Sequence, residues 1–591
     1  MRRKSEEFLT HEPGNIHSHK TGPLLAGLFK SRRQNPSLGV LPSILGHADD
    51  PSRQPGPQFG ERGAAECPRS AQTGNSQYPA GPGESDAMAR VVGAALMGVD
   101  GVPVEVEVRI SAQLPRIDIV GLPELSVRES AARVRAAIAS VGERFPQNRI
   151  TVNLAPAALR KGGAGLDLAI AVGILVASGA LEEEATGAMA FVGELALDGR
   201  LRGVRGELAM TLAARDAGCR AIMTPTRSAP CAALAPDVQV FAAADLGEVI
   251  AHLRGAEVLT PEVPESFEES TATPQLCLSD VRGQEGAKRG LEIAAGGGHG
   301  LLLSGPPGAG KSMLARRIPG ILPPLRTEEA LLATRIHDAA GLLSPDRPGL
   351  PARPFRSPHH TSSAAGLLGG GSPPVPGEVS LAHAGVLFLD ELPEFDRRAR
   401  ESLRQVLEDR CIVLARANYT FRLPADFLLV ATANPCPCGW WGSRQRACRC
   451  DPRAIGRYRD RISGPLLDRI DLHIPVPGQS WSDLAGPAAE ETSPDVRERV
   501  RLARNRQLAR GGACNGDLSD ANLDQTLGTT AQANALLGRA VDRLRLSARA
   551  ARRIQRVART IADLAGQDAV SPEAIGEALA YRHEQGPEDS P

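Results

Sequence analysis

A glycine-rich turn in the middle of the chain has the residue types and spacing of a phosphate-binding loop. It follows an apolar run at 300–304, fits the pattern GxxxxGK[ST], and consists of Gly305, Pro306, Pro307, Gly308, Ala309, Gly310, Lys311 and Ser312. Backbone N–H groups in such a turn point at phosphates, and the dipole of the following helix adds to the attraction. We expect Lys311 to reach the β and γ oxygens and Ser312 to offer its hydroxyl to Mg²⁺. The sequence therefore predicts a site for a nucleoside triphosphate.

Two carboxylates end a buried-strand pattern further along the chain. Residues 385–391 read Gly-Val-Leu-Phe-Leu-Asp-Glu, and such an uninterrupted apolar run is typical of a parallel strand covered on both faces. Acids at the carboxyl end of such a strand lie where α/β sheets bind ligands. We expect Asp390 to hold Mg²⁺ through water and Glu391 to polarise the attacking water as general base. The alternative is a core strand followed by a solvated acidic turn.

A third strand pattern, at 427–434, ends in Asn434. A polar amide at this place is suited to orienting the hydrolytic water, the role called sensor 1. The alternative is an asparagine that caps the next turn, since Pro435 blocks continuation of the strand.

Together these motifs resemble those of an AAA+ ATPase. The segments Phe-Arg-Ser-Pro-His-His-Thr at 355–361, Gly-Gly-Gly at 369–371 and Pro-Gly-Glu-Val-Ser-Leu-Ala-His at 376–383 narrow the resemblance. They are similar to the magnesium-chelatase-like AAA+ proteins of bacteria, the YifB/ComM family, and the similarity runs from about Ala89 to the end of the chain. The resemblance implies a hexameric homo-oligomer that hydrolyses ATP with Mg²⁺. For ComM it implies ATP-driven branch migration of DNA, or helicase activity, in recombination and natural transformation.

The resemblance also implies a fold and further site residues. The fold is α/β: an N-terminal Lon-protease-like domain (ribosomal S5 domain 2-like), a central AAA+ P-loop NTPase domain and a C-terminal helical lid. Val281 and Gly283 lie in the segment that contacts adenine in AAA+ proteins.

Two arginine roles follow from the same resemblance. Arg469 occupies the place of the arginine finger that a neighbouring subunit supplies, with Arg459 and Arg461 as alternatives. Arg549 occupies the place of the sensor 2 arginine, with two less favoured substitutes, Arg552 and Arg553.

Composition and periodicity divide the chain into five parts: a leader at 1–87, the Lon-like domain at 88–255, a linker at 256–275, the ATPase core at 276–478 and a helical domain at 479–591. The leader is rich in Pro, Gly, Ser, Gln, His and Arg and has no period, which predicts disorder. Met88 opens the coherent sequence, so we expect Met88 to be the true start. A transit peptide is the alternative, although several acidic residues count against it.

Periodicity predicts the elements of the outer domains. In the Lon-like domain we expect strands at 102–108, 117–123 and 150–154, helices at 129–141 and 166–178, and a hairpin at 193–204. In the C-terminal domain we expect helices at 495–510 and 546–564 and a last helix with Ser571 as N-cap. The arginines of 495–510 are expected to form a solvated face that contacts DNA.

The Lon-like resemblance raises a Ser–Lys peptidase as a second enzyme hypothesis. Gly165 stands where the Lon-type motif has its nucleophilic serine. Glycine has no nucleophile, so the acyl-enzyme cannot form, and we interpret the domain as a scaffold or a collar that contacts DNA or a partner.

Four cysteines, Cys436, Cys438, Cys448 and Cys450, lie in one loop. In a reducing compartment such density favours a metal over disulfides, and four thiolates are suited to a structural zinc. The spacing is CxC instead of CxxC, and a reduced loop with incidental thiols is the alternative. Trp440, Trp441 and nearby arginines are candidates for stacking on bases and contacting phosphates, or for packing the loop itself.

Two further loops are candidate DNA contacts. A hairpin at 411–423 carries Arg416, Asn418 and Arg422, and His359 with His360 are expected to contact DNA or the next subunit instead of a metal.

The charge balance and the apolar pattern limit the functional class. The 591 residues contain 68 basic and 68 acidic side chains, so DNA binding requires a local basic patch. No run of eighteen apolar residues occurs, so we expect a cytoplasmic protein with no membrane partner. Two other functions stay open: a metal-chelatase-type motor subunit and a chaperone-like AAA+ ring, both remodelling a protein partner.

Overall fold

The computed structural model describes residues 87–157, 161–264, 276–344, 346–371, 374–415, 420–481, 485 and 491–582. The predicted leader up to 86 and the linker residues from 265 to 275 lie outside this range. Ala87 and Met88 begin the first strand.

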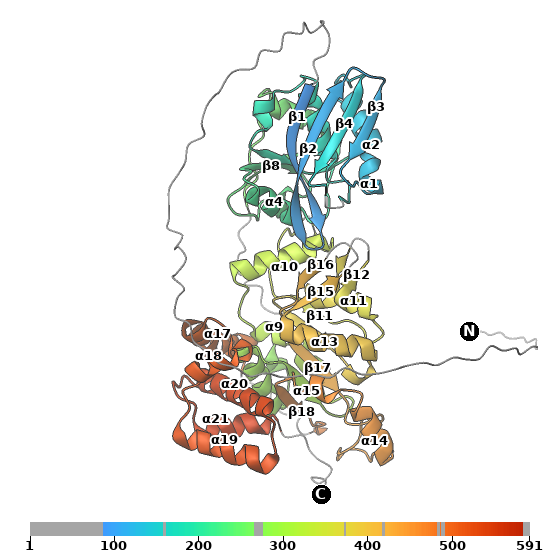
Figure 1. Ribbon diagram of the computed structural model, residues 1–591. Coiled ribbons are helices and arrows are strands. Elements are labelled where there is room, and N and C mark those ends of the chain that lie inside the picture. Colours follow the sequence, from blue (N-terminus) through green and yellow to red (C-terminus); the bar gives the residue numbers. More distant parts are fainter. Residues whose placement is uncertain are drawn as a thin grey trace, which may run out of the picture. The chain divides into compact units, whose positions relative to one another are not determined.

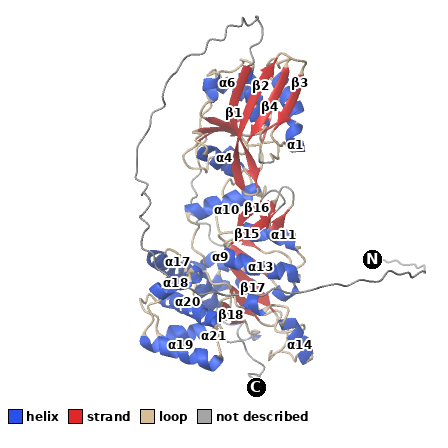
Figure 2. Cartoon of the chain, in the orientation of Figure 1, coloured by secondary structure: helices blue, strands red, loops and turns tan. Residues whose placement is uncertain are grey.

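The N-terminal domain is built on a seven-stranded mixed sheet of order β3-β4-β2-β1-β5-β8-β9, flanked by helices (Figures 1 and 2). Its elements are β1 (Ala87–Met97), β2 (Asp100–Ser111), β3 (Arg116–Val120), α1 (Leu125–Arg128), α2 (Ser130–Ser140), β4 (Arg149–Ala155), α3 (Asp167–Ala177), η1 (Glu183–Thr186), β5 (Met189–Phe191), the hairpin β6 (Glu194–Leu195) and β7 (Leu201–Arg202), α4 (Glu207–Asp216), β8 (Ala221–Pro225), α5 (Ala229–Ala232), β9 (Gln239–Ala243) and α6 (Leu246–Leu253). The predicted strands, helices and hairpin of this domain are confirmed, with ends shifted by a few residues. The helix α3 is buried along its whole length and packs on β1 and β2, which explains its uninterrupted apolar sequence.

The central domain has a five-stranded sheet of order β11-β14-β17-β10-β18 in which every pair is parallel. Its strands are β10 (Leu301–Ser304), β11 (Phe355–Arg356), β14 (Val386–Leu389), β17 (Leu428–Ala433) and β18 (Leu472–Pro475), and two hairpins pair β12 (Gly369–Gly370) with β13 (Val375–Pro376) and β15 (Cys411–Ala415) with β16 (Thr420–Pro424). The helices are η2 (Leu278–Asp280), α7 (Glu285–Gly297), α8 (Lys311–Ala315), α9 (Ile318–Ile321), α10 (Thr327–Ala339), α11 (Ala364–Leu368), α12 (Glu378–Leu381), η3 (Leu392–Glu394), α13 (Arg397–Asp409), α14 (Pro452–Arg459) and α15 (Gly464–Leu467). The α/β class predicted for this part is confirmed.

The register of this sheet brings three strand ends to one edge. Ser304 of β10 pairs with Ala433 of β17, and Leu389 of β14 pairs with Ala431 of β17. The strands β17 and β18 follow one another in the chain yet flank β10, so the strand order reverses at β10. Ligands of open α/β sheets bind at such a point, beyond the carboxyl ends of the strands.

The C-terminal part is helical: α17 (Ser493–Gly511), η4 (Asn515–Asp517), α18 (Asp520–Thr526), α19 (Ala531–Leu544), α20 (Ala548–Leu564) and α21 (Pro572–Ala580). The predicted stripe of α20 is confirmed, because Ile554, Val557 and Ile561 are buried in a core shared with the central sheet. Ser571 accepts a hydrogen bond from the backbone N–H of Ala574, so its predicted role as N-cap of α21 is confirmed.

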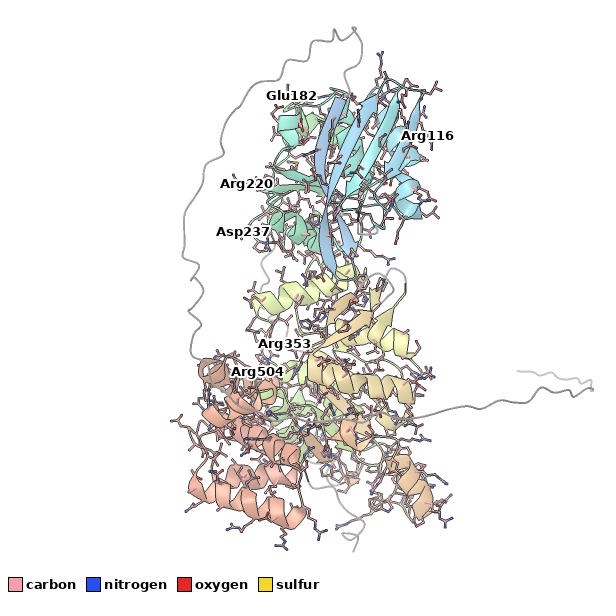
Figure 3. All side chains as sticks on the ribbon, in the orientation of Figure 1. Arg116, Glu182, Arg220, Asp237, Arg353 and Arg504 are labelled. Carbon is pink, nitrogen blue, oxygen red and sulfur yellow. The ribbon has the colours of Figure 1, made fainter. Side chains whose placement is uncertain are left out.

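Several arginines of α17, which were expected to form a solvated face, also contact other parts of the chain. Arg497 donates to the Gly320 carbonyl at 2.9 Å, and Arg504, labelled in Figure 3, donates to the Ala295 carbonyl at 2.9 Å. Arg506 donates to the Asp563 carbonyl at 3.0 Å. These carbonyls lie near the ends of neighbouring helices, where backbone acceptors are left over. Arg506 is exposed all the same, and the DNA contact expected for α17 stays a prediction.

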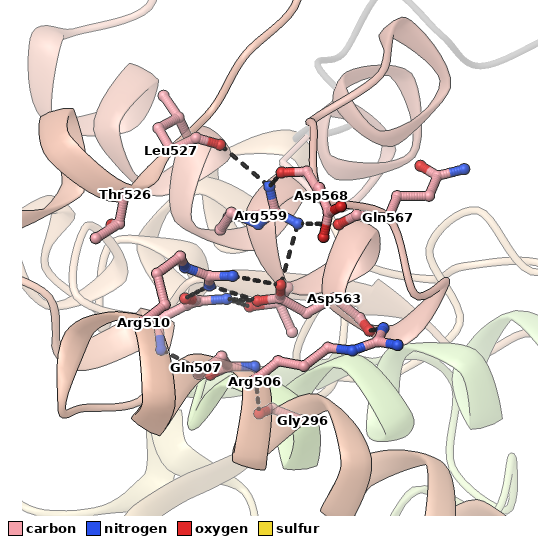
Figure 4. Close-up of polar contacts among 12 residues, drawn as sticks. Gly296, Arg506, Gln507, Arg510, Thr526, Leu527, Arg559, Asp563, Gln567 and Asp568 are labelled. Carbon is pink, nitrogen blue, oxygen red and sulfur yellow. Dashed lines mark hydrogen bonds and ion pairs between the residues drawn. The ribbon is translucent and has the colours of Figure 1, made fainter.

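The charged centre of the helical part is Asp563, drawn in Figure 4. Its carboxylate accepts two hydrogen bonds of 2.7 Å from Arg510, one of 3.0 Å from Arg559 and one of 2.8 Å from Asn515. The Arg559 side chain is fully buried and also donates to the carbonyls of Leu527 and Asp568. A buried cation needs this counter-charge, so the packing of α17 against α20 depends on it.

Removing that carboxylate should destabilise the helical part. Asp563→Ala leaves Arg559 buried without its ion pair, and we expect a loss of about 3–5 kcal/mol in the free energy of unfolding. Asp524→Ala is the matched control, because the Asp524–Arg552 pair is largely exposed and should cost under about 1 kcal/mol. Urea unfolding followed by circular dichroism measures both, and equal losses would contradict the assignment.

Candidate functional site

The phosphate loop joins β10 to α8 at the reversal of the strand order. Gly308 and Gly310 have φ values of 78° and 88°, which only glycine adopts without strain. A Cβ on Gly308 would meet no atom within 4 Å, so the space over the loop is open. A Cβ on Gly305 would instead lie 2.0 Å from the Val476 carbonyl oxygen, so this position requires glycine for packing. The predicted strand, turn and helix are confirmed, and the open backbone cradle fits a polyphosphate.

Lys311 begins α8 and is buried against the loop. Its ammonium donates to the carbonyl oxygens of Gly305 at 2.7 Å and Pro306 at 3.0 Å, and to Oδ1 of Asn434 at 3.0 Å. Burial lowers the pKa of Lys311, while the charges of Asp390 and Glu391 oppose that shift. The structure therefore brings together Lys311 and Asn434, which are far apart in the sequence.

The two acids follow β14 beside the loop. Ser312 donates from Oγ to Oδ2 of Asp390 at 3.0 Å, so the two predicted magnesium ligands lie next to one another. Hydroxyl and carboxylate oxygens are the ligands that Mg²⁺ prefers, and this pair fits the ion. Glu391 is exposed and has φ 55° and ψ 53°, a left-handed conformation that is costly for a residue with a side chain.

Thr432 of β17 holds both acids and was missed by the sequence reasoning. It is buried, donates from Oγ1 to Oδ1 of Asp390 at 2.6 Å, and accepts from the backbone N–H of Glu391 at 2.8 Å. These bonds orient the Asp390 carboxylate and satisfy the strained turn at Glu391. The available signal was a single hydroxyl in an otherwise apolar strand.

The segment expected to contact adenine lies beside the phosphate loop. Gln284 donates from Nε2 to the Ala309 carbonyl at 3.3 Å and to the Pro477 carbonyl at 2.8 Å. Val281 is fully buried, and Gly283 is exposed with φ 60°. These contacts tie the segment to the loop.

The candidate trans-acting arginines are held within the chain. The Arg469 guanidinium pairs with Glu408 and donates to the Pro465 carbonyl at 2.7 Å, and its side chain is 5% exposed. Arg461 pairs with Glu394 at 2.8 Å, and the Arg459 guanidinium lies 4.0 Å from the centre of the Trp441 ring. In this arrangement Arg469 is not presented to solvent.

The sensor 2 candidates differ in their surroundings. Arg549 is exposed in the first turn of α20. Arg552 pairs with Asp524, and Arg553 is mostly buried at 3.3 Å from Asp471. The structure does not bring Arg549 into the polar network of Lys311.

The four cysteines of the loop after β17 lie in one cluster. Their Sγ atoms are all within 4.8 Å of one another, and those of Cys436, Cys438 and Cys448 are 3.4–3.7 Å apart. Backbone N–H groups donate to the sulfurs of Cys436 and Cys448 at 3.4 Å.

Among the other candidate contacts, Arg416 and Asn418 lie outside the described residues. Arg422 donates to the sulfur of Cys411 at 3.5 Å. The rings of His359 and His360 are 4.2 Å apart, and Nδ1 of His359 is hydrogen-bonded to Thr361 at 2.8 Å.

The position expected for a peptidase nucleophile has apolar surroundings. A Cβ on Gly165 would face Val204 at 3.6 Å and the sulfur of Met210 at 3.8 Å. Lys161 is buried, and its ammonium donates to the carbonyls of Gly121 at 3.2 Å, Leu154 at 3.0 Å and Pro156. Gly165 therefore supplies no nucleophile, and the Lys161 ammonium is held by backbone carbonyls.

Three family profiles match this chain in succession. They are subunit ChlI of Mg-chelatase over residues 106–228, magnesium chelatase subunit ChlI over 277–484, and the C-terminal part of magnesium chelatase subunit ChlI over 490–582.

Curated relatives match over most of their length. An uncharacterized protein YifB of Salmonella typhimurium is 43% identical over 83% of this chain and 96% of its own. The competence protein ComM of Haemophilus influenzae is 42% identical over 84% of this chain and 97% of its own. An uncharacterized protein of Mycobacterium tuberculosis is 41% identical over 84% of this chain and 99% of its own. The chain belongs to the YifB/ComM family of magnesium-chelatase-like proteins.

Family membership agrees with the geometry of the site. The ChlI-type AAA+ class indicates an oligomeric ATPase that uses ATP and Mg²⁺. Among the described residues, no helix combines the length and the apolar character that crossing a membrane requires.

Thr432 provides a test of how the acids are positioned. Thr432→Val removes the hydroxyl at nearly constant volume, so we expect hydrolysis to fall about tenfold or more and to require more Mg²⁺ for half-maximal rate. Nucleotide binding without Mg²⁺ should be unchanged, and Thr432→Ser should restore both parameters. Thr334→Val is the control, since Thr334 is equally buried but accepts only a loop N–H of Leu350. Wild-type Mg²⁺ dependence in Thr432→Val would contradict this role.

Proposed function

We propose that this member of the YifB/ComM family is the subunit of a hexameric ATP-driven ring that acts on DNA, by branch migration or helicase activity in recombination and natural transformation. The observation that carries the ATPase assignment is the joined constellation of Lys311, Asn434, Ser312, Asp390 and Thr432. The DNA assignment rests on a relative named as a competence protein. We place this activity in the cytoplasm.

Each side chain of the site has a defined task in hydrolysis. Lys311 exchanges its contacts with the loop carbonyls and Asn434 for oxygens of the β and γ phosphates. Ser312 and Asp390 would hold Mg²⁺, which would supply charge neutralisation at the phosphates. Glu391 accepts a proton from the attacking water, and Asn434, released from Lys311, orients that water.

The ring completes the site from a neighbouring subunit. Arg469 stabilises the charge that develops on the γ-phosphate of the neighbour, for which it must leave Glu408. Arg549 contacts nucleotide from the C-terminal helices, which act as a lid, and the adenine lies against Val281 and Gly283. The N-terminal domain serves as a Lon-like scaffold.

The cysteine cluster is a structural zinc site in this proposal. Tetrahedral Zn²⁺ with bonds of about 2.3 Å places its sulfur ligands about 3.8 Å apart. The Sγ separations of 3.4–3.7 Å among Cys436, Cys438 and Cys448 fit this geometry, and Cys450 lies within 4.8 Å of them. Backbone N–H groups donate to the sulfurs of Cys436 and Cys448, the kind of outer contact that holds metal ligands in position.

A local basic surface lies on the cysteine loop and α14, as the neutral overall charge requires for DNA. Five exposed arginines lie between the second tryptophan and the start of the last turn of α14: Arg444, Arg446, Arg449, Arg453 and Arg457. The Arg446 guanidinium lies 5.6 Å from the centre of the Trp440 ring. Cations beside an aromatic ring favour a nucleic-acid strand. The chelatase-type and chaperone-like alternatives require a protein partner instead.

DNA-stimulated hydrolysis tests the proposed function. We expect branched DNA to raise ATP turnover more than casein or a porphyrin, and high salt to weaken the effect steeply. Lys311→Ala should abolish nucleotide binding, and Glu391→Gln should bind ATP but turn it over at least about a hundredfold slower. Stimulation by protein or porphyrin but not by DNA would favour the alternatives, and wild-type turnover in Glu391→Gln would refute the general base.

Subunit mixing tests the arginine finger. Arg469→Ala should bind ATP but hydrolyse it about a thousandfold slower, because no cation from the neighbour reaches the transition state. Mixing it with Lys311→Ala should restore some turnover wherever an intact pocket meets an intact finger.

Glu408→Gln is the control for a merely structural ion pair, since it removes the partner of Arg469 but keeps the guanidinium. If Glu408→Gln loses as much activity as Arg469→Ala, or if mixed rings show no complementation, Arg469 is structural. The finger is then Arg459 or Arg461.

A further inference from the structure

We propose that the metal-bound cysteine loop, residues 436–450, forms one wall of the nucleotide pocket, so that metal occupancy sets nucleotide affinity. This inference rests on the proposed nucleotide site and zinc site. It adds a coupling between the two.

The cysteine loop contacts the phosphate loop directly. Gly439 is buried and has φ 79°, and a Cβ at this position would lie 2.5 Å from Cδ of Pro307. Pro307 is a residue of the phosphate loop, next to the open glycine Gly308. The backbone of Gly439 therefore supports the turn whose N–H groups face the phosphates.

The same loop also contacts the segment expected to lie at the adenine end. Gln445 donates from Nε2 to the Gln479 carbonyl at 2.8 Å. The side chain of Gln479 in turn donates to the Arg282 carbonyl, beside Gly283. Two separate contacts thus connect the cysteine loop to both ends of the predicted nucleotide site.

The cysteine loop has little internal structure besides its sulfur cluster. Residues 436–450 contain no helix or strand, and of these residues only Cys436 and Gly439 are buried. Such a segment buries too little apolar area to offset its conformational entropy, so a metal that joins the four sulfurs is what fixes it. The two buried residues also connect the metal site to the nucleotide site. Cys436 is a proposed metal ligand, and Gly439, which packs on the phosphate loop, donates its N–H to the Cys436 carbonyl at 2.9 Å.

It follows that without the metal Gly439 no longer holds Pro307 in place, and Gln445 no longer holds Gln479. The phosphate loop then orders only when nucleotide binds, which reduces the apparent affinity. The chemistry of the ligand set, four cysteine sulfurs within 4.8 Å of one another, selects a thiophilic divalent ion such as Zn²⁺.

Zinc content and the affinity for a fluorescent ADP analogue, measured on the full chain with Mg²⁺ present, test the coupling. We expect about one zinc per chain, and removal with a zinc-selective chelator should weaken ADP-analogue binding about tenfold, with recovery when Zn²⁺ is returned. Unchanged affinity after zinc removal, or no zinc uptake by the purified protein, would overturn the proposal.

Two glycine variants distinguish the effect of the contact between Gly439 and Pro307 from the effect of the metal. Gly439→Ala should keep its zinc but bind the analogue about tenfold more weakly, since the added methyl group displaces Pro307. Gly442→Ala is the matched control: φ is 74° in the same loop, but a Cβ there would meet no atom within 4 Å. It should keep both zinc and affinity. Equal affinities of the two variants would overturn the proposed wall.

Lys311→Ala distinguishes failure of the coupling from failure of the proposed function. It should retain zinc and lose nucleotide binding. If wild type binds the analogue and Lys311→Ala does not, while zinc removal has no effect, only the coupling fails. If wild type does not bind the analogue, the nucleotide site fails and the coupling with it.

Discussion

The hydrogen bonds of Thr432 connect the strands on which the chemistry depends. One hydroxyl orients Asp390 toward Ser312 and also satisfies the backbone of Glu391 in its left-handed turn. This geometry exists only because β14 and β17 are parallel and in register, with their carboxyl ends at one edge. The same edge carries the phosphate loop, since β10 pairs with β17 on the other side. The acids, the lysine and the amide thus depend on one sheet register.

Two groups of arginines differ in their surroundings, those that contact other parts of the chain and those that are exposed on the cysteine loop and α14. Arginines of α17 and α20 donate to helix-end carbonyls and to Asp563, where they hold the helical part against the central sheet. The exposed arginines of the cysteine loop and α14 are free of that role, which is why the proposed DNA contact lies there.

The cysteine loop lies beside the phosphate loop and also carries exposed arginines. It leaves the sheet directly after Asn434, at the edge where nucleotide is expected, and then leads into α14. Its buried glycine packs on the phosphate loop, while its arginines face solvent. In the proposed function, a metal-fixed segment in this position would connect the nucleotide site with the DNA contact in one short stretch of chain.

Local sequence by itself determined the phosphate loop, the apolar strands with their terminal acids and amide, the stripe of α20 and the cap at Ser571. Each of these depends on interactions between residues close in the chain, so spacing and residue type suffice to predict them. Tertiary structure alone decided the bond between Lys311 and Asn434, the role of Thr432, the contact of Gly439 with Pro307 and the pairing of Arg469 with Glu408. It also decided that Arg497, Arg504 and Arg506 donate to carbonyls of neighbouring helices, which the spacing of residues within one helix does not indicate. Such contacts join segments far apart in the sequence, and only the packing of the sheet and helices brings their partners together.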